Sequence, residues 1–364
     1  MKVADVHQIL EDWAPGHLAE DFDNTGLLVG DPKQEVTGIL VSLDCLEIVV
    51  EEAIDKGCNL IVCFHPILFK GLKKITGKSY VERTVIKALQ NQVAIYALHT
   101  RLDNHRQGVN DRICAELGLE QRQILLPKKE ELLKLVTYVP EQQAEQLKTS
   151  LFAAGAGAVG RYEECSFSSK GEGQFKPTSE ANPHLGQQGS LEKVEEIQLQ
   201  VLVEKAKQKQ VHQALVNNHP YEEVAHEWIL LQNDHQDIGM GMIGEFEAPM
   251  EEEQFFKLIK ARFGTPVLRH SALRKKPIRR VAVLGGSGAF AIGAAQGAGA
   301  DAYLTADLKY HNFFEAENRL LLVDIGHYES EQFTKNLICE YLSEKITSFA
   351  VTLAESITNP INYF

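Results

Sequence analysis

The fold is decided by three short apolar runs, Gly38-Ile-Leu-Val-Ser-Leu43, Leu60-Ile-Val-Cys-Phe64 and Val93-Ala-Ile-Tyr-Ala-Leu98. Runs of this length and composition are typical of strands buried on both faces. Segments with helical periodicity separate them, at 46–56 and 81–90. Strands that alternate with helices predict βαβ units and a mostly parallel sheet, and therefore an α/β protein.

The same plan returns near the C-terminus, where apolar runs at 280–284, 301–305 and 320–325 alternate with helical segments at 311–317 and 331–342. Both halves end a strand with a histidine and place a carboxylate four residues later. These pairs are His99 with Asp103 and His327 with Glu331. We interpret the pattern as a degenerate internal duplication. The alternative, that all βαβ units look alike, explains the strands but not the matched spacing.

Residues 129–235 have a different character. The patterns predict strands at 132–139, 196–203 and 224–231 and helices at 141–153 and 206–217. We expect a long exposed hairpin loop at 165–190. This order predicts a small α+β sandwich of ferredoxin type. The sequence thus predicts a duplicated βαβ domain, residues 1–128 and 236–364, split by a domain inserted at 129–235.

Composition excludes several classes of protein. The chain has 364 residues with 37 Lys+Arg against 50 Asp+Glu, a net charge of −13, which disfavours nucleic acid as a partner. No apolar run approaches the roughly 18 residues that span a bilayer, and the first residues lack the pattern of a signal peptide. Six scattered cysteines without a CxxC pair predict reduced thiols and a cytoplasmic location.

Candidate chemistry gathers at the carboxyl ends of the predicted parallel strands, where open α/β sheets hold their ligands. The residues are His65, His99, Asp103, His327 and Glu331. One such histidine alone is ordinarily a hydrogen-bonded core or surface side chain. Three histidines and two carboxylates in a duplicated pattern instead predict a site for Zn, Fe or Mn, and carboxylates are able to bridge two ions.

Two further segments are weaker candidates. Leu284-Gly-Gly-Ser-Gly-Ala289 completes neither a dinucleotide-binding nor a nucleophile-elbow motif. We expect it to permit a close backbone approach at a strand-to-helix turn, with free N–H groups for a phosphate and with Ser287 and Gly288 as substrate contacts. His311 follows the strand that ends near Thr305, and we expect it to line the same cleft.

Four segments resemble the GTP cyclohydrolase I type 2 homologues, a family of NGG-interacting-factor-like dinuclear metal proteins. They are Asp23-Asn-Thr-Gly-Leu-Leu-Val-Gly-Asp31, Phe64-His-Pro-Ile-Leu-Phe69, His99-Thr-Arg-Leu-Asp103 with Gly108-Val-Asn-Asp111, and Gly326-His-Tyr-Glu-Ser-Glu331. The insert, with Asn218-His-Pro-Tyr-Glu-Glu-Val224, resembles a PII/CutA-like domain.

The resemblance implies two divalent metal ions per subunit, zinc foremost, in a toroidal homohexamer. It also implies four ligands in this sequence, His65, Asp103, His327 and Glu331, with Glu331 as the bridge. One position departs from the family, which usually has two adjacent histidines where this chain has Phe64-His65. Phenylalanine offers no ligand atom, so the second ion is placed in doubt, and we expect His99 to compensate.

The leading functional hypothesis is a metal-dependent hydrolase that uses a metal-activated water. The family name implies a nucleotide substrate, GTP, and His99 or His311 would move protons. The alternative is a non-enzymatic, oligomeric metal-binding regulatory or scaffold protein. The inserted domain and Phe64 both favour that alternative.

Overall fold

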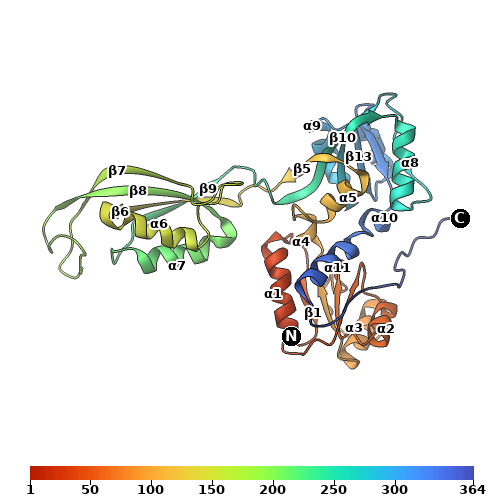
Figure 1. Ribbon diagram of the computed structural model, residues 1–364, viewed down its shortest axis with the longest axis horizontal. Coiled ribbons are helices and arrows are strands. Elements are labelled where there is room, and N and C mark those ends of the chain that lie inside the picture. The colour runs from red at the N-terminus through yellow and green to blue at the C-terminus, as the bar shows by residue number, and fades with distance from the viewer. The chain divides into compact units, whose positions relative to one another are not determined.

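The computed structural model describes all 364 residues, which divide into two compact units. The first unit comprises residues 1–127 and 237–364, and the second comprises residues 128–236 (Figure 1). The second unit therefore interrupts the first one between two neighbouring strands, β5 (Glu120–Pro127) and β10 (Gly239–Met250).

The first sheet of unit 1 has the strand order β1-β4-β3-β2-β15. Its strands are β1 (Gly26–Val29), β2 (Ile39–Ser42), β3 (Leu60–Cys63), β4 (Ala94–Ala97) and β15 (Val351–Leu353). All pairs are parallel except β1 with β4. Every residue of β2, β3 and β4 is buried, as the continuous apolar runs predict for strands covered on both faces.

The second sheet of unit 1 has the order β11-β14-β13-β12-β10-β5. Its remaining strands are β11 (Arg269–His270), β12 (Ile278–Ser287), β13 (Ala302–Ala306) and β14 (Leu321–Asp324). The series β11-β14-β13-β12 repeats β1-β4-β3-β2 of the first sheet, with one antiparallel pair followed by two parallel pairs. This repeated strand order is what an internal duplication produces.

One face of each sheet contributes to a single core. Val62 and Tyr96 of the first sheet belong to the same buried cluster as Val283 and Val323 of the second sheet. Helices complete this core: α1 (Val3–Trp13), α5 (Val109–Leu117), α8 (Glu252–Phe263) and α11 (Thr334–Lys345). The outer face of the first sheet packs on α2 (Glu47–Asp55) and α3 (Tyr80–Gln90), and that of the second on α9 (Ile292–Gly297). The shared core joins the two halves into one unit.

Unit 2 follows the chain order β6 (Leu132–Pro140), α6 (Ala144–Ala153), β7 (Ser166–Phe175), β8 (Glu192–Glu204), α7 (Gln208–Asn218) and β9 (His226–Leu231). These strands form an antiparallel sheet of order β7-β8-β6-β9. Leu147 of α6 and Leu215 of α7 share one buried cluster with Leu199 and Val201 of β8, so both helices cover the same face. This is the βαββαβ arrangement of ferredoxin-like folds. The PII/CutA-like assignment stays a prediction.

Some sequence-based expectations were wrong. The segment 165–190 is not one exposed loop, because its first part forms the edge strand β7, whose glycines and serines hide its strand character. The helix expected at 331–342 is two helices, α10 (His327–Glu331) and α11. The segment expected as a helix at 311–317 is the 3₁₀ helix η5 (Tyr310–Ala316).

None of the helices has the length and apolar character that crossing a membrane requires.

Candidate metal centre

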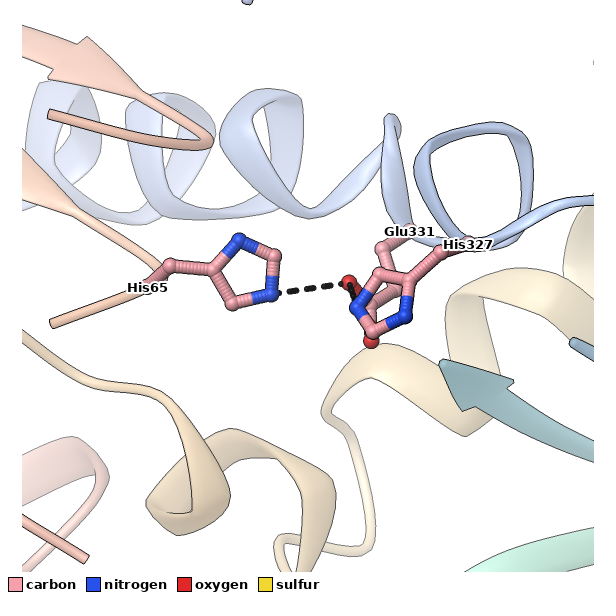
Figure 2. A group of neighbouring side chains, drawn as sticks. All are labelled: His65, His327 and Glu331. Atoms are coloured by element: carbon pink, nitrogen blue, oxygen red, sulfur yellow. Dashed lines mark ion pairs between the residues drawn. The ribbon is translucent and has the colours of Figure 1, made fainter. Parts of the chain in front are cut away.

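Three side chains from the two halves of unit 1 meet at the carboxyl ends of its parallel strands. His65 lies in the turn after β3, and His327 and Glu331 are the first and last residues of α10 (Figure 2). His327 and Glu331 are four residues apart in this helix, so their side chains lie on one face. Gly326 permits the sharp entry into α10, because its φ is +95° and a Cβ there would lie 2.2 Å from Oε2 of Glu329.

The three donor atoms converge on one point. Nε2 of His65 lies 3.0 Å from Oε2 of Glu331, and Nε2 of His327 lies 3.2 Å from the same oxygen. All three ligand atoms lie within 4.8 Å of one another. Oε2 of Glu331 is buried and makes no contact with full hydrogen-bond geometry. Two imidazole nitrogens and a carboxylate oxygen, buried and poorly satisfied by one another, fit a divalent cation such as Zn²⁺.

Each histidine at this edge is oriented by a carboxylate on its other ring nitrogen. Nδ1–H of His65 donates to Asp44 at 2.8 Å and Nδ1–H of His327 donates to Asp307 at 2.7 Å. This directs both Nε2 atoms to Glu331, as second-shell carboxylates do in zinc sites. The sequence analysis missed these aspartates. Each lies just beyond the carboxyl end of a strand (Asp44 two residues after β2, Asp307 directly after β13), which is the signal that could have found them.

Opposite charges set the pKa values of the three converging residues. Burial alone would lower the pKa of His65, but Glu331 and Asp44 outweigh it and raise that pKa to about 10. Burial also opposes protonation of His327, and Asp307 and Glu331 raise its pKa to about 11. Burial would raise the pKa of Glu331, yet the two imidazoles lower it to about 2. A metal ion would therefore compete with protons for the two Nε2 atoms.

Asp103 stands apart from the three converging residues. It ends the short helix α4 (Thr100–Asp103) and does not belong to the group of donor atoms within 4.8 Å. Burial, followed by the negative charge of Glu331, raises the pKa of its carboxyl group well above the usual range. Its strong interaction with Glu331 and His65 shows that it borders the centre.

His99 lies beside the centre. Its ring centroid is 5.5 Å from that of His65, and its Nδ1–H donates to Asp23 at 2.8 Å. Its φ of +37° is strained for a residue with a side chain, and such strain is concentrated at functional sites. The ring of Phe64 is fully buried, 4.9 Å from the ring of His65 and 5.6 Å from that of His99. An apolar ring therefore occupies the flank of the centre.

The glycine segment at 284–289 lets the backbone pass close to neighbouring side chains. A Cβ on Gly286 would lie 2.4 Å from Oε1 of Glu331, and one on Gly288 would lie 2.1 Å from Oγ1 of Thr305. Two of the N–H groups expected to be free are engaged, because those of Gly285 and Gly286 donate to Asn110 and Ser330. The reason is that the strand passes directly over α5 and α10, whose polar side chains take these donors.

Ser287 and His311 do not belong to the group of three converging residues. The hydroxyl of Ser287 donates to Asp307, which in turn holds His327. His311 is exposed on η5, with its ring 5.2 Å from that of Tyr310 and 6.1 Å from that of Phe314. Ser287 thus contacts Asp307, the residue that orients His327, and His311 lies in an exposed aromatic cluster.

Comparisons with known proteins agree with this architecture. The family described as Duf34/NIF3 (NGG1p interacting factor 3) matches residues 1–360. A GTP cyclohydrolase 1 type 2 homolog of Halalkalibacterium halodurans is 37% identical, and the match covers 100% of both chains. Another, of Bacillus subtilis, is 35% identical over 98% of this chain and 97% of its own.

Among solved structures, a Bacillus cereus protein related to NIF3 superimposes with a TM-score of 0.84 at 34% identity, covering 100% of this chain and 99% of that one. A Staphylococcus aureus protein gives 0.82 at 29% identity, covering the same shares of the two chains. The predicted family and the mixed α/β fold class are thereby confirmed. With its full length matched and a His/His/Glu group that is able to hold a metal ion, the chain belongs to the Duf34/NIF3 family.

Proposed function

We propose that this protein is a divalent-metal-dependent hydrolase. The observation that carries the proposal is the convergence of two Nε2 atoms on one buried carboxylate oxygen, with each imidazole held from behind by an aspartate. A divalent ion held by His65, His327 and Glu331 would polarise a substrate and lower the pKa of water towards neutrality. Such a ligand set supplies three protein donors and leaves a position for substrate, as catalytic sites require.

The residues around this ligand set supply the other functions of a hydrolytic site. Asp44 and Asp307 direct both Nε2 atoms at the ion, because each accepts a hydrogen bond from Nδ1–H. His99 is the proposed proton carrier, because its Nδ1–H is engaged by Asp23 and its ring lies against that of His65. His311 is the weaker candidate for this role, since it is exposed on η5.

We propose zinc as the first choice of metal, with iron or manganese as alternatives, and two ions per subunit of unequal affinity. The first ion takes the three converging donors. Asp103 and Glu331 would hold the second ion. It is held more weakly, because Phe64 offers no donor on that flank.

The proposed substrate is a small molecule of the nucleotide class, with GTP as the first compound to test because of the name that the relatives carry. The experiment incubates the zinc-, manganese- or iron-loaded protein with GTP and follows products by chromatography. Turnover that disappears in His327→Ala supports the proposal. Turnover that persists unchanged in this variant would refute it.

A second candidate function is a non-enzymatic metal-binding regulator or scaffold. The buried ring of Phe64 favours it, because a weakly held second ion suits a metal sensor better than a two-metal hydrolase. Stoichiometric binding of metal with no turnover of nucleotides, dinucleotides or peptides would select this function.

We also propose a homohexamer in the cytoplasm that binds neither nucleic acid nor membranes. The net charge of −13 supports the absence of nucleic-acid binding and the six unpaired cysteines support the cytoplasm, while the homohexamer rests on the family resemblance. Light scattering on the purified protein should give six times the chain mass of 40.6 kDa.

A further inference from the structure

Unit 2 contains a cavity of about 750 Å³ that the metal chemistry leaves unexplained. It opens on the face of the sheet opposite α6 and α7. Glu196 and Gln198 of β8 line it, and they alternate along the strand with Ile197 and Leu199, which face the helices. The volume lies within the range of about 300–1,000 Å³ typical of small-molecule sites.

The floor of this cavity is formed by bare backbone. Gly171 of β7 pairs with Glu196 of β8, and Gly173 follows on the same face. A Cβ on Gly173 would lie 2.1 Å from Oε2 of Glu196. The missing side chains therefore let the Glu196 carboxylate lie flat along the floor. Glycines within a strand often mark a place where a ligand approaches the backbone.

The wall is aromatic and is ordered by local contacts. The ring of Tyr221 lies 6.1 Å from that of Phe175 and 6.3 Å from that of His184. The Tyr221 hydroxyl donates to Oε1 of Glu196 at 2.7 Å. The N–H of Asn182 donates to Glu222 at 2.8 Å and anchors the loop that carries His184.

The charges of the cavity are unfavourable for an anion. Four carboxylates and two lysines line it: Glu172, Glu196, Glu222, Glu223, Lys170 and Lys176. Of these, Glu172 is neutralised by Lys193, and Lys170 is neutralised by Glu141. The remaining excess is negative, so the cavity favours a ligand that brings N–H donors or positive charge and disfavours phosphate.

We propose that this cavity binds a flat heteroaromatic molecule that presents two adjacent N–H donors to Glu196, as the edge of guanine or a pterin does. Tyr221 uses one lone pair of the carboxylate, which leaves both oxygens able to accept. The ring of Tyr221 stacks on the heterocycle, and the ring of Phe175, tilted by 56° to that of Tyr221, contacts its edge. The ligand is a base or nucleoside, because no unpaired cationic cluster is present for phosphates.

The test compares guanosine with inosine, which lacks the 2-amino group, by calorimetric titration of the full-length protein. Sites that hydrogen-bond a ligand reject analogues that lack the group. We expect guanosine to bind at least tenfold more tightly than inosine, and Glu196→Gln to remove that preference. Glu195→Gln is the matched control, because the neighbouring side chain projects from the other face of the sheet. Thermal unfolding checks that both variants fold.

Glu331→Gln separates this site from the metal centre, because it alters unit 1 alone, and the preference for guanosine over inosine should persist in it. The proposal is overturned if guanosine gives no saturable binding at millimolar concentration or if guanosine and inosine bind equally. It is also overturned if Glu331→Gln abolishes binding while Glu196→Gln does not, because the ligand then sits in the metal centre.

Discussion

Glu331 is the residue on which the metal centre depends, because both converging imidazoles meet its Oε2 atom. We expect Glu331→Gln to weaken zinc binding by more than the roughly 10–100-fold that loss of a second-shell partner costs. Metal content after dialysis, measured by mass spectrometry, checks this. His311→Ala is the control and should keep its metal, since His311 is exposed on η5. Equal metal content in wild type and Glu331→Gln would contradict the assignment.

Phe64 stands where the family resemblance led us to expect a histidine. Its ring is buried against the rings of His65 and His99, so an imidazole in its place would face the same site. We expect Phe64→His to raise the number of tightly bound ions per chain from about one to about two. Phe64→Leu is the control for lost ring volume and should not raise it. A count that stays the same in Phe64→His would show that this side chain does not limit the second ion.

At the scale of elements, β12 and α10 are in contact through Gly286 and Glu331. A Cβ on Gly286 would lie 2.4 Å from Oε1 of Glu331, and the φ of +67° is itself unfavourable for alanine. We expect Gly286→Ala to displace the carboxylate and lower zinc affinity at least tenfold. Gly293→Ala is the matched control, because a Cβ there meets nothing within 4 Å. Zinc titrations of the two variants check the prediction, which fails if both bind like wild type.

The C-terminal segment after β15 is attached to α2 by Glu52. Its carboxylate accepts hydrogen bonds from the N–H groups of Glu355 and Ser356 at 2.8 and 2.9 Å and an ion pair from Lys56. Burial would raise the pKa of Glu52, but these donors lower it to about 2. A lowered pKa means that the stabilisation is complete above the unfolded pKa near 4.5 and is lost as the pH falls towards 2.

We therefore expect Glu52→Gln to lower the free energy of unfolding of unit 1 by about 2 kcal/mol at pH 7. The difference from wild type should shrink at pH 3. Urea unfolding at both pH values checks this. Glu51→Gln is the control, because Glu51 is exposed and pairs only at the surface with Lys87. A Glu52→Gln penalty of the same size at pH 3 and pH 7 would rule out this account.

At the scale of the whole molecule, unit 2 is inserted between two paired strands of unit 1, so the two ends of unit 1 at the insertion lie next to each other. Pro127 of β5 pairs directly with Gly239 of β10, so a short turn can join these strands as a hairpin. We expect a chain in which such a turn replaces residues 128–236 to fold and to bind zinc within about threefold of wild type. Circular dichroism and zinc titration check this. A folded chain without zinc binding would show that unit 2 contributes to the centre.

The predictable part of the fold came from local patterns. Continuous apolar runs predicted β2, β3 and β4, because both faces of these strands are buried. The edge strand β7, whose side chains are mostly exposed, was assigned to a loop, since they carry little periodic signal. The strand β10 was missed although its first part is buried, because its glycines and methionines do not give a strand pattern. Whether such a segment becomes a strand is decided by the partner that it pairs with, which lies far away in the sequence.

The sequence by itself determined the duplicated plan, the inserted unit and the histidines and carboxylates at the strand ends, because these depend on spacing along the chain. Only the tertiary structure decided that His65, His327 and Glu331 share one point while Asp103 stands apart. It alone showed that Asp44 and Asp307 hold the two imidazoles. The physical reason is that the shared core sets which strand ends meet, and ångström-scale convergence follows from that packing and not from spacing along the chain.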